Sequence, residues 1–270
     1  MDRMDPSEAT VKKSFSYVPG FAAEVTLNGL KALAEMDGVE SVAIDEVYHV
    51  MLAQGIPLIN ATTARETYNG SGVSIAICDS GIDVSHPMLG GTSTFPNDKV
   101  IGGYDTGDDD DDPRPDSTSG TAHGTSCAGI AAGSLGSEGD YIGGVAYNAK
   151  LYSVKVTYGT SGSAYTSDII EGWEWCITHQ YDDADNPILI ISTSMGGGSY
   201  TSACDASQPA LAAAADNAVA AGITLFVSSG NDGYCSAIAA PACVSSVNAV
   251  GAVYDATLGG YGWCVNSASC

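Results

Sequence analysis

The chain has 270 residues, of which 44% are hydrophobic, so there is enough apolar material for one or two domains with a sizeable core. Nine basic side chains stand against 32 acidic ones, and the net charge at pH 7 is −23. A surface this acidic repels phosphates, which argues against nucleic acid or an anionic membrane as a partner. No segment is long and apolar enough to span a bilayer. The first six residues have no hydrophobic region, so an exported protein would carry its signal further upstream.

The eight cysteines favour an oxidising compartment. None of them forms a CxxC pair with zinc-type spacing, so disulfides are expected rather than a metal centre. Cys235 with Cys243 is the best local pair and Cys264 with Cys270 the next, but spacing alone does not fix the connectivity. Two more lie among apolar or small residues and are expected to be buried thiols: Cys78 and Cys127.

Residues 14–50 read as a small first unit. Alternating segments at 15–18 and 22–25 flank a Pro-Gly turn and predict two strands. A helix with Asn28 as its N-cap is expected to run through Leu30, Leu33 and Met36 and to stop at Gly38, followed by a third strand at 39–44. A piece this small buries little core by itself, so it needs a partner surface.

From about residue 51 the pattern changes to alternating strands and helices. Helices are expected at 167–180, with Trp173 in the core, and at 207–221. Four apolar segments predict buried strands: 73–78, 151–156, 188–192 and 223–227. This alternation favours a parallel sheet covered on both faces, in which functional groups gather at the carboxyl ends of the strands.

Three motifs follow in chain order. Asp79 stands in Asp-Ser-Gly-Ile-Asp at a strand end, His123 in His-Gly-Thr at the start of a small-residue helix, and Asn231 in Ser-Ser-Gly-Asn-Asp-Gly after another strand. Each has a structural explanation when taken alone: a helix cap, a core histidine and a turn. A rigidly held histidine also suits proton transfer, and the order of the three motifs favours that interpretation.

Together these motifs resemble the subtilisin-like serine peptidases (subtilases), whose catalytic residues run in the order Asp, His, Ser. The resemblance implies an α/β fold: a three-layer domain with a mostly parallel central sheet over residues 51–270, after a partial, small α+β propeptide domain over 1–50. It also implies a secreted, self-processed endopeptidase that cleaves proteins or peptides. The propeptide would act as its intramolecular inhibitor and be cut off within Val47–Gln54.

Residue roles follow from the same resemblance. Asp79 would orient the imidazole of His123, which would act as the general base, and Asn231 would donate a hydrogen bond to the oxyanion. The remaining matches would line the substrate cleft: Gly162, Ser194, Met195, Gly196, Ser229 and Gly230.

The chain departs from the family pattern at the nucleophile. Subtilases carry a serine in a Gly-Thr-Ser-Met-Ala type motif well after the asparagine, and no such motif follows Asn231 here. Ser194 precedes Asn231 and fits the substrate-binding strand, so it is rejected as the nucleophile. We expect the serine to lie beyond residue 270 and the chain as given to be inactive. The alternative is a catalytically inactive subtilase-like binding protein.

The acidic run before His123 is similar to a calcium-binding loop of kexin-like subtilases. By that match Asp105, Asp110 and Asp112 would be the ligands of a structural calcium ion. The other interpretation is a solvated acidic loop. Residues 196–200 lack the paired acidic residues of the kexin-like enzymes, so strict dibasic cleavage is not supported. No motif for an organic cofactor is recognised.

Overall fold

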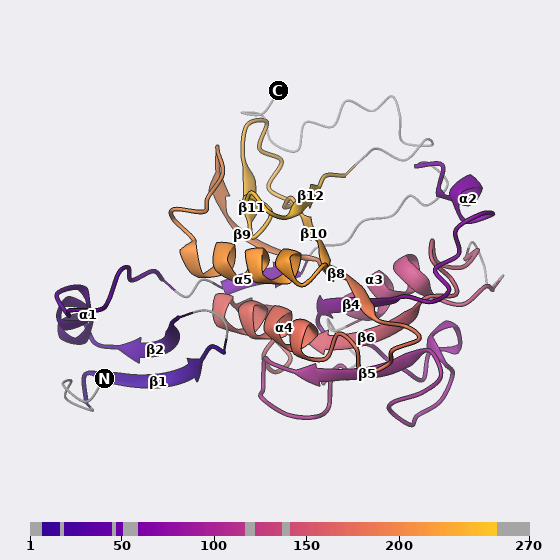
Figure 1. Ribbon diagram of the computed structural model, residues 1–270, viewed down its shortest axis with the longest axis horizontal. Helices are drawn as coiled ribbons and strands as arrows, with labels where there is room; N and C mark the ends of the chain where they lie inside the picture. The colour runs from indigo at the N-terminus through magenta and orange to yellow at the C-terminus, as the bar shows by residue number, and fades with distance from the viewer. Residues whose placement is uncertain are drawn as a thin grey trace.

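The computed structural model describes residues 7–16, 19–44, 47–50, 59–116, 122–136 and 141–252, with the backbone alone for 47–50. A small unit comes first in the chain. Strands β1 (Ala9–Ser14) and β2 (Phe21–Val25) pair antiparallel, and helix α1 (Leu27–Ala34) follows. This unit lies beside the main body, next to α4 (Thr166–Thr178), and takes no part in the central sheet (Figure 1).

The main body is built on a six-stranded parallel sheet with the order β12-β10-β8-β4-β6-β5. Its strands are β4 (Ser74–Asp79), β5 (Val100–Asp105), β6 (Lys150–Lys155), β8 (Ile188–Thr193), β10 (Thr224–Ser228) and β12 (Asn248–Val250). Strand β4 is buried along its whole length, as expected for a strand covered on both faces.

Helices cover both faces of this sheet. On one face α4 and α5 (Pro209–Ala220) pack over alternate residues of β4 such as Ala76 and Cys78. On the other face α3 (His123–Ala132) packs over Ile75 and Ile77. The result is the three-layer α/β architecture that the sequence predicts. Two short helices complete the described part: α2 (Ala61–Ala64) and η1 (Pro87–Leu89).

A second sheet is antiparallel, with the order β11-β9-β3-β7. Its strands are β3 (Val47–Val50), β7 (Ser163–Tyr165), β9 (Met195–Tyr200) and β11 (Ile238–Ala240). Strand β3 comes from the N-terminal part of the chain and inserts between β7 and β9 of the main body. No helix in the described part combines the length and hydrophobicity needed to cross a bilayer.

Several local predictions for the first unit are wrong. Residues 39–44 alternate in polarity but form no strand. The first strand ends at Ser14, and Phe15 and Ser16 of the predicted segment 15–18 lie outside it, while residues 17–18 are not among the described residues. The α1 helix begins two residues earlier than predicted, because the Thr26 side chain, not Asn28, accepts the hydrogen bond that caps it. Hydroxyl and amide caps are close in preference, so the sequence did not separate the two.

The disulfide pairing also differs from the best local pair. Cys243 is bonded to Cys204, 39 residues away, and not to Cys235. The Cys204 amide also donates to the Cys243 carbonyl, so backbone pairing brings the two together. Cys264 and Cys270 lie outside the described residues. Of the two predicted buried thiols, Cys78 is buried and Cys127 is half-buried.

Candidate active site

The candidate site lies at the edge of the central sheet where the carboxyl ends of its strands meet. Asp79 is the last residue of β4, and the neighbouring strand β8 ends at Thr193. Strand β10 ends at Ser228, three residues before Asn231. Parallel pairing therefore brings two of the three predicted motifs to one edge, and helix α3 brings the third.

Asp79 and His123 form a close pair. The His123 Nδ1 atom lies 2.9 Å from Asp79 Oδ1 and 3.0 Å from Oδ2. The aspartate is fully buried, while the histidine side chain keeps 11% of its surface exposed. With a proton on Nδ1 shared with the carboxylate, Nε2 is left to accept a proton from a nucleophile.

Small residues allow this close approach. A Cβ on Gly124 would lie 2.5 Å from the Gly81 carbonyl oxygen and 3.1 Å from Asp79 Cβ, so only glycine lets α3 start so near β4. The Gly124 amide donates to the Ser80 hydroxyl at 3.0 Å. The Asp79 carboxylate in turn accepts the Ser80 amide at 2.7 Å, so both partners are fixed from the backbone.

Cys127 lies one turn further along α3 and joins the histidine to the next strand. Its Sγ is 3.6 Å from His123 Nδ1 and 3.5 Å from the hydroxyl of Ser194. Burial, aided by the charge of Asp79, raises the pKa of this thiol well above its usual range. Asp79, His123 and Cys127 are also the one group of potential metal ligands gathered in the described part of the chain. The Asp79–His123 hydrogen bonds agree with the pairing that the sequence predicts, and the Cys127 thiol packs against that pair.

Two of the predicted substrate-binding residues, Met195 and Gly196, pair with β3, and two more, Gly162 and Ser194, directly precede the strands on either side of it. His49 pairs with Gly196 of β9 on one side and with Ser163 of β7 on the other. Val50 pairs with Met195, the first residue of β9, and Ser194 directly precedes it in the chain. Gly162, with a positive φ of 67°, ends the turn that leads into β7. An extended segment of this chain thus lies between the two strands that the sequence predicts to flank the substrate.

Asn231, Ser229 and Gly230 lie in the loop that follows β10. The Ser229 amide donates to the Val250 carbonyl at 2.9 Å, and its carbonyl accepts the Ala239 amide at the same distance. Gly230 has a φ of 109°, which a side chain would strain. Asn231 is exposed. The loop is therefore tied down at Ser229, while the amide predicted to face the oxyanion stays accessible.

The acidic loop after β5 is organised by a buried lysine that the sequence reasoning missed. The side chain of Lys155 is fully buried at the end of β6, directly opposite Asp79 in the pairing of β6 with β4. Its ammonium lies 2.7 Å from Asp105 and 2.8 Å from both Asp108 and Asp116. It also donates to the Thr157 carbonyl at 2.8 Å.

This network has clear electrostatic consequences. Burial raises the pKa of Asp105 to about 6, against the opposing effect of the Lys155 ammonium. The carboxylates hold the pKa of Lys155 above its usual range even though burial lowers it. Asp108 also accepts the Gly159 amide at 2.8 Å. Lys155 and Asp108 therefore connect the acidic loop to the loop that leads to β7.

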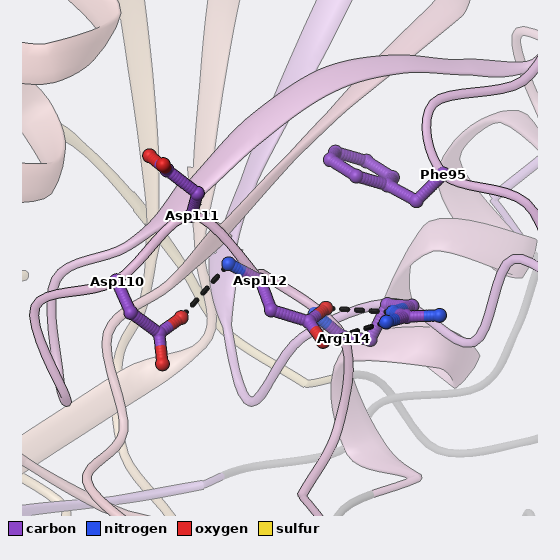
Figure 2. A pocket seen from close by; sticks show the side chains of 5 residues that line it. All are labelled: Phe95, Asp110, Asp111, Asp112 and Arg114. Atoms are coloured by element: carbon purple, nitrogen blue, oxygen red, sulfur yellow. Dashed lines mark hydrogen bonds and ion pairs between the residues drawn. The ribbon is translucent and has the colours of Figure 1, made fainter.

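The three predicted calcium ligands are not gathered into one site. Asp105 is held by Lys155, and Asp112 forms paired hydrogen bonds with Arg114 at 2.6 and 2.7 Å. Figure 2 shows that the Asp110 carboxylate accepts the Asp112 amide, while the Asp111 side chain points away from both. Phe95 lies on the opposite side of the pocket that these residues line. Two of the three carboxylates already have intrachain cations, so as arranged this loop does not fit a calcium ion.

Comparison with protein families decides the identity of the main body. The model described as "Subtilase family" matches residues 70–264, and the model described as "Peptidase inhibitor I9" matches residues 2–51. The chain belongs to the subtilase family. The resemblance predicted from the three motifs is therefore confirmed.

Among curated proteins, this subtilase is 34% identical over 250 residues to serine protease AprX of Bacillus subtilis and 35% identical over 253 residues to subtilisin E of the same species. These alignments cover 91% and 90% of the chain but only 53% and 58% of the two relatives. The chain thus spans little more than half the length of the relatives it matches.

Solved structures agree on the fold. The S41 psychrophilic protease matches with a TM-score of 0.51 and 30% identity, covering 68% of this chain and 53% of that one. A mutant of the epidermin leader peptide processing serine protease from Staphylococcus aureus matches with a TM-score of 0.65 over 90% of this chain and 64% of that one, at 16% identity. The latter likeness shows the fold alone.

Proposed function

We propose that the protein containing this chain is a secreted serine endopeptidase, made as a zymogen that residues 1–50 keep inactive until it processes itself. One observation carries the proposal: a buried Asp79–His123 pair is linked through Cys127 to Ser194, the residue before β9, and β3 of the same chain pairs with β9. A carboxylate that orients a histidine is the arrangement that activates a serine hydroxyl.

The proposed reaction is acyl transfer from a peptide to serine and then to water. Nε2 of His123 takes the proton of the serine hydroxyl as its oxygen attacks the carbonyl carbon, and later gives that proton to the leaving amine. Asp79 stabilises the imidazolium that forms in between. The side-chain amide of Asn231 would donate to the oxyanion, and in subtilisin itself the loss of such a donor lowers turnover by about 10²–10³.

The nucleophile is proposed to come from a part of the protein outside residues 1–270. No serine after Asn231 stands in the family's motif, and the matched relatives extend well beyond the aligned region. Ser194 does not fit the role: it directly precedes β9, the strand that pairs with β3, and its hydroxyl contacts the Cys127 thiol. The activity of the whole protein is therefore a proposal about the longer chain.

The proposed substrates are proteins or peptides that bind in an extended form. Such a segment would add as a strand between β7 and β9, as β3 does, using main-chain hydrogen bonds for affinity. The processing bond is proposed to lie within Val47–Gln54, so a mature N-terminus beyond Ile59 would contradict it. Residues 51–58 lie outside the described part of the structure.

The test is labelling of the full-length protein with a serine-directed fluorophosphonate. We expect one labelled site, lost in His123→Ala and kept in the matched control His86→Ala, whose side chain is exposed and caps η1. A folded full-length protein that is not labelled, or whose labelling survives His123→Ala, would instead support a subtilase-like binding protein without catalysis.

A further inference from the structure

One basic side chain of the first unit enters the surface of the main body. Lys13, near the end of β1, has a side chain only 17% exposed. Its ammonium lies 2.8 Å from Asp168 and 2.8 Å from Glu171 of α4. It also donates to the carbonyl of Thr106 in the acidic loop. These three groups, Thr106, Asp168 and Glu171, are called the α4 recess below.

The neighbouring lysine provides a natural comparison. The pairing of β1 with β2 shifts register between Val11 and Lys13, so the strand is bulged at Lys12. Lys12 pairs instead with Glu24 on the outer side, where the two side chains are 50% and 77% exposed. Two adjacent lysines therefore have opposite surroundings, and only Lys13 reaches α4.

The recess is built to hold a cation. The side chain of Asp168 is 2% exposed, and one of its oxygens also accepts the Tyr165 amide. Glu171 lies one turn further along the same face of α4, and Glu174, one turn beyond, accepts the Ser16 amide at 2.9 Å. Burial lowers the pKa of Lys13, but the carboxylates outweigh it and leave that pKa raised, so the side chain is an ammonium.

The Lys13 contact matters for the association of the first unit with the main body because both parts carry a negative net charge. Residues 1–50 contain four basic and nine acidic side chains, and residues 51–270 contain five basic and 23 acidic ones. Two bodies that are both strongly acidic repel each other over a wide surface. A lysine placed in a carboxylate recess offsets that repulsion locally, and removing it leaves Asp168 covered without its cation.

We propose that the α4 recess is a lysine-recognition site through which the peptidase domain selects its inhibitor domain, with Lys13 as the residue recognised. The inference rests on the proposed role of residues 1–50 as inhibitor. It extends that role to partner choice, because an inhibitor domain with a neutral or acidic residue at this strand position would be rejected.

The test measures how fast the inhibitor unit leaves the main body. A recognition sequence for a site-specific protease is placed within residues 51–58 of the 270-residue chain, the folded chain is cut, and dissociation of the nicked complex is followed by size-exclusion chromatography. We expect Lys13→Gln and Glu171→Gln each to speed dissociation about 10- to 100-fold, whereas Lys12→Gln leaves it unchanged. Lys13→Glu combined with Glu171→Lys should recover part of the loss.

Equal dissociation of the Lys13→Gln and Lys12→Gln complexes would overturn the proposal, as would a charge-reversed pair no better than Lys13→Glu alone. Circular dichroism of the uncut variants shows that both units remain folded, and Glu171→Gln tests the contact from the opposite side if Lys13→Gln unfolds the first unit. This readout uses no catalysis. A protein that lacks peptidase activity but passes this test would contradict the proposed function and leave the recognition site intact.

Discussion

Lys155 is a buried ammonium on β6, the strand next to β4, and it lies opposite Asp79 in the pairing of these strands. Four oxygens surround its nitrogen at 2.7–2.8 Å, three of them from carboxylates of the acidic loop. Burying one charge is costly, and only good geometry with several partners offsets that cost. The ion pairs of Lys155 therefore contribute little net stability, but they fix the acidic loop after β5 relative to the loop after β6.

Replacing this lysine tests how it holds the two loops. We expect Lys155→Met to lower the free energy of unfolding by about 3–5 kcal/mol, because three carboxylates would then face one another without a cation. Lys31→Met, on the exposed surface of α1, is the matched control and should change it by less than about 0.5 kcal/mol. Urea denaturation of both variants provides the comparison, and a loss below about 1 kcal/mol for Lys155→Met would show that the loop relaxes around the missing charge.

At the scale of elements, the notable feature is that β3 completes a sheet of the main body. It lies between β7 and β9 and pairs antiparallel with both, so backbone pairing joins these two strands through β3. Without β3, strands β7 and β9 would each have an unpaired backbone edge, and such an edge is a template for other extended chains. The backbone pairing with β7 and β9 that would bind an extended substrate therefore also holds β3 in place.

Proline at position 49 tests this pairing. His49 is the pairing partner of Gly196 on one side and of Ser163 on the other. Proline has no N–H, so it removes a backbone donor from a strand that is paired on both sides. In the nicked complex, His49→Pro should speed dissociation of the N-terminal fragment at least about tenfold. His49→Ala keeps the backbone donor and is the control. Similar rates for the two variants would show that side-chain contacts, not strand pairing, hold β3.

The elements also show what the sequence can and cannot predict. Strands β4, β6, β8 and β10 were predictable because they are short, mainly apolar segments rich in Ile, Val and Leu. Strand β10 differs from the prediction in that it is not fully buried: its side chains alternate between exposed and buried. Strand β5 has two adjacent glycines and β9 three, which hide the strand pattern. Residues 39–44 alternate correctly but find no partner strand. The alternation of polar and apolar residues is a property of one segment, whereas strand formation also needs a neighbouring strand that the rest of the fold supplies.

The same reasoning explains the candidate site. Asp79 and His123 were predictable because each lies in a compact motif. The partners of Lys155 were not, since Asp105, Asp108 and Asp116 reach it only through the pairing of β5 with β6 and the loop that follows. One signal was available: a lysine in an otherwise apolar strand, in a chain with a long acidic run, indicates a buried ion pair. The Cys204–Cys243 bond had no local signal.

At the scale of the whole molecule, the net charge of −23 dominates the electrostatics. Like charges distributed over a compact body repel, and folding brings them closer than they are in the unfolded chain. The ion pairs described above are concentrated around the acidic loop and the α4 recess, where carboxylates are densest. These cations offset only part of the negative charge, because the seven aspartates of residues 105–116 pair with Lys155 and Arg114 alone among the described residues.

Salt should therefore stabilise the chain. We expect its melting temperature to rise as NaCl increases from 0.01 to 0.5 M (about 30 to below 8 Å in Debye length), because screening weakens the general repulsion more than the buried pairs. CaCl₂ and MgCl₂ at equal ionic strength should raise it equally, since Asp105 and Asp112 already have cationic partners in Lys155 and Arg114. A larger rise in CaCl₂, reversed by a chelator, would show that the acidic loop rearranges to bind calcium as the sequence predicts. A melting temperature that falls with NaCl would mean that the surface ion pairs outweigh the repulsion.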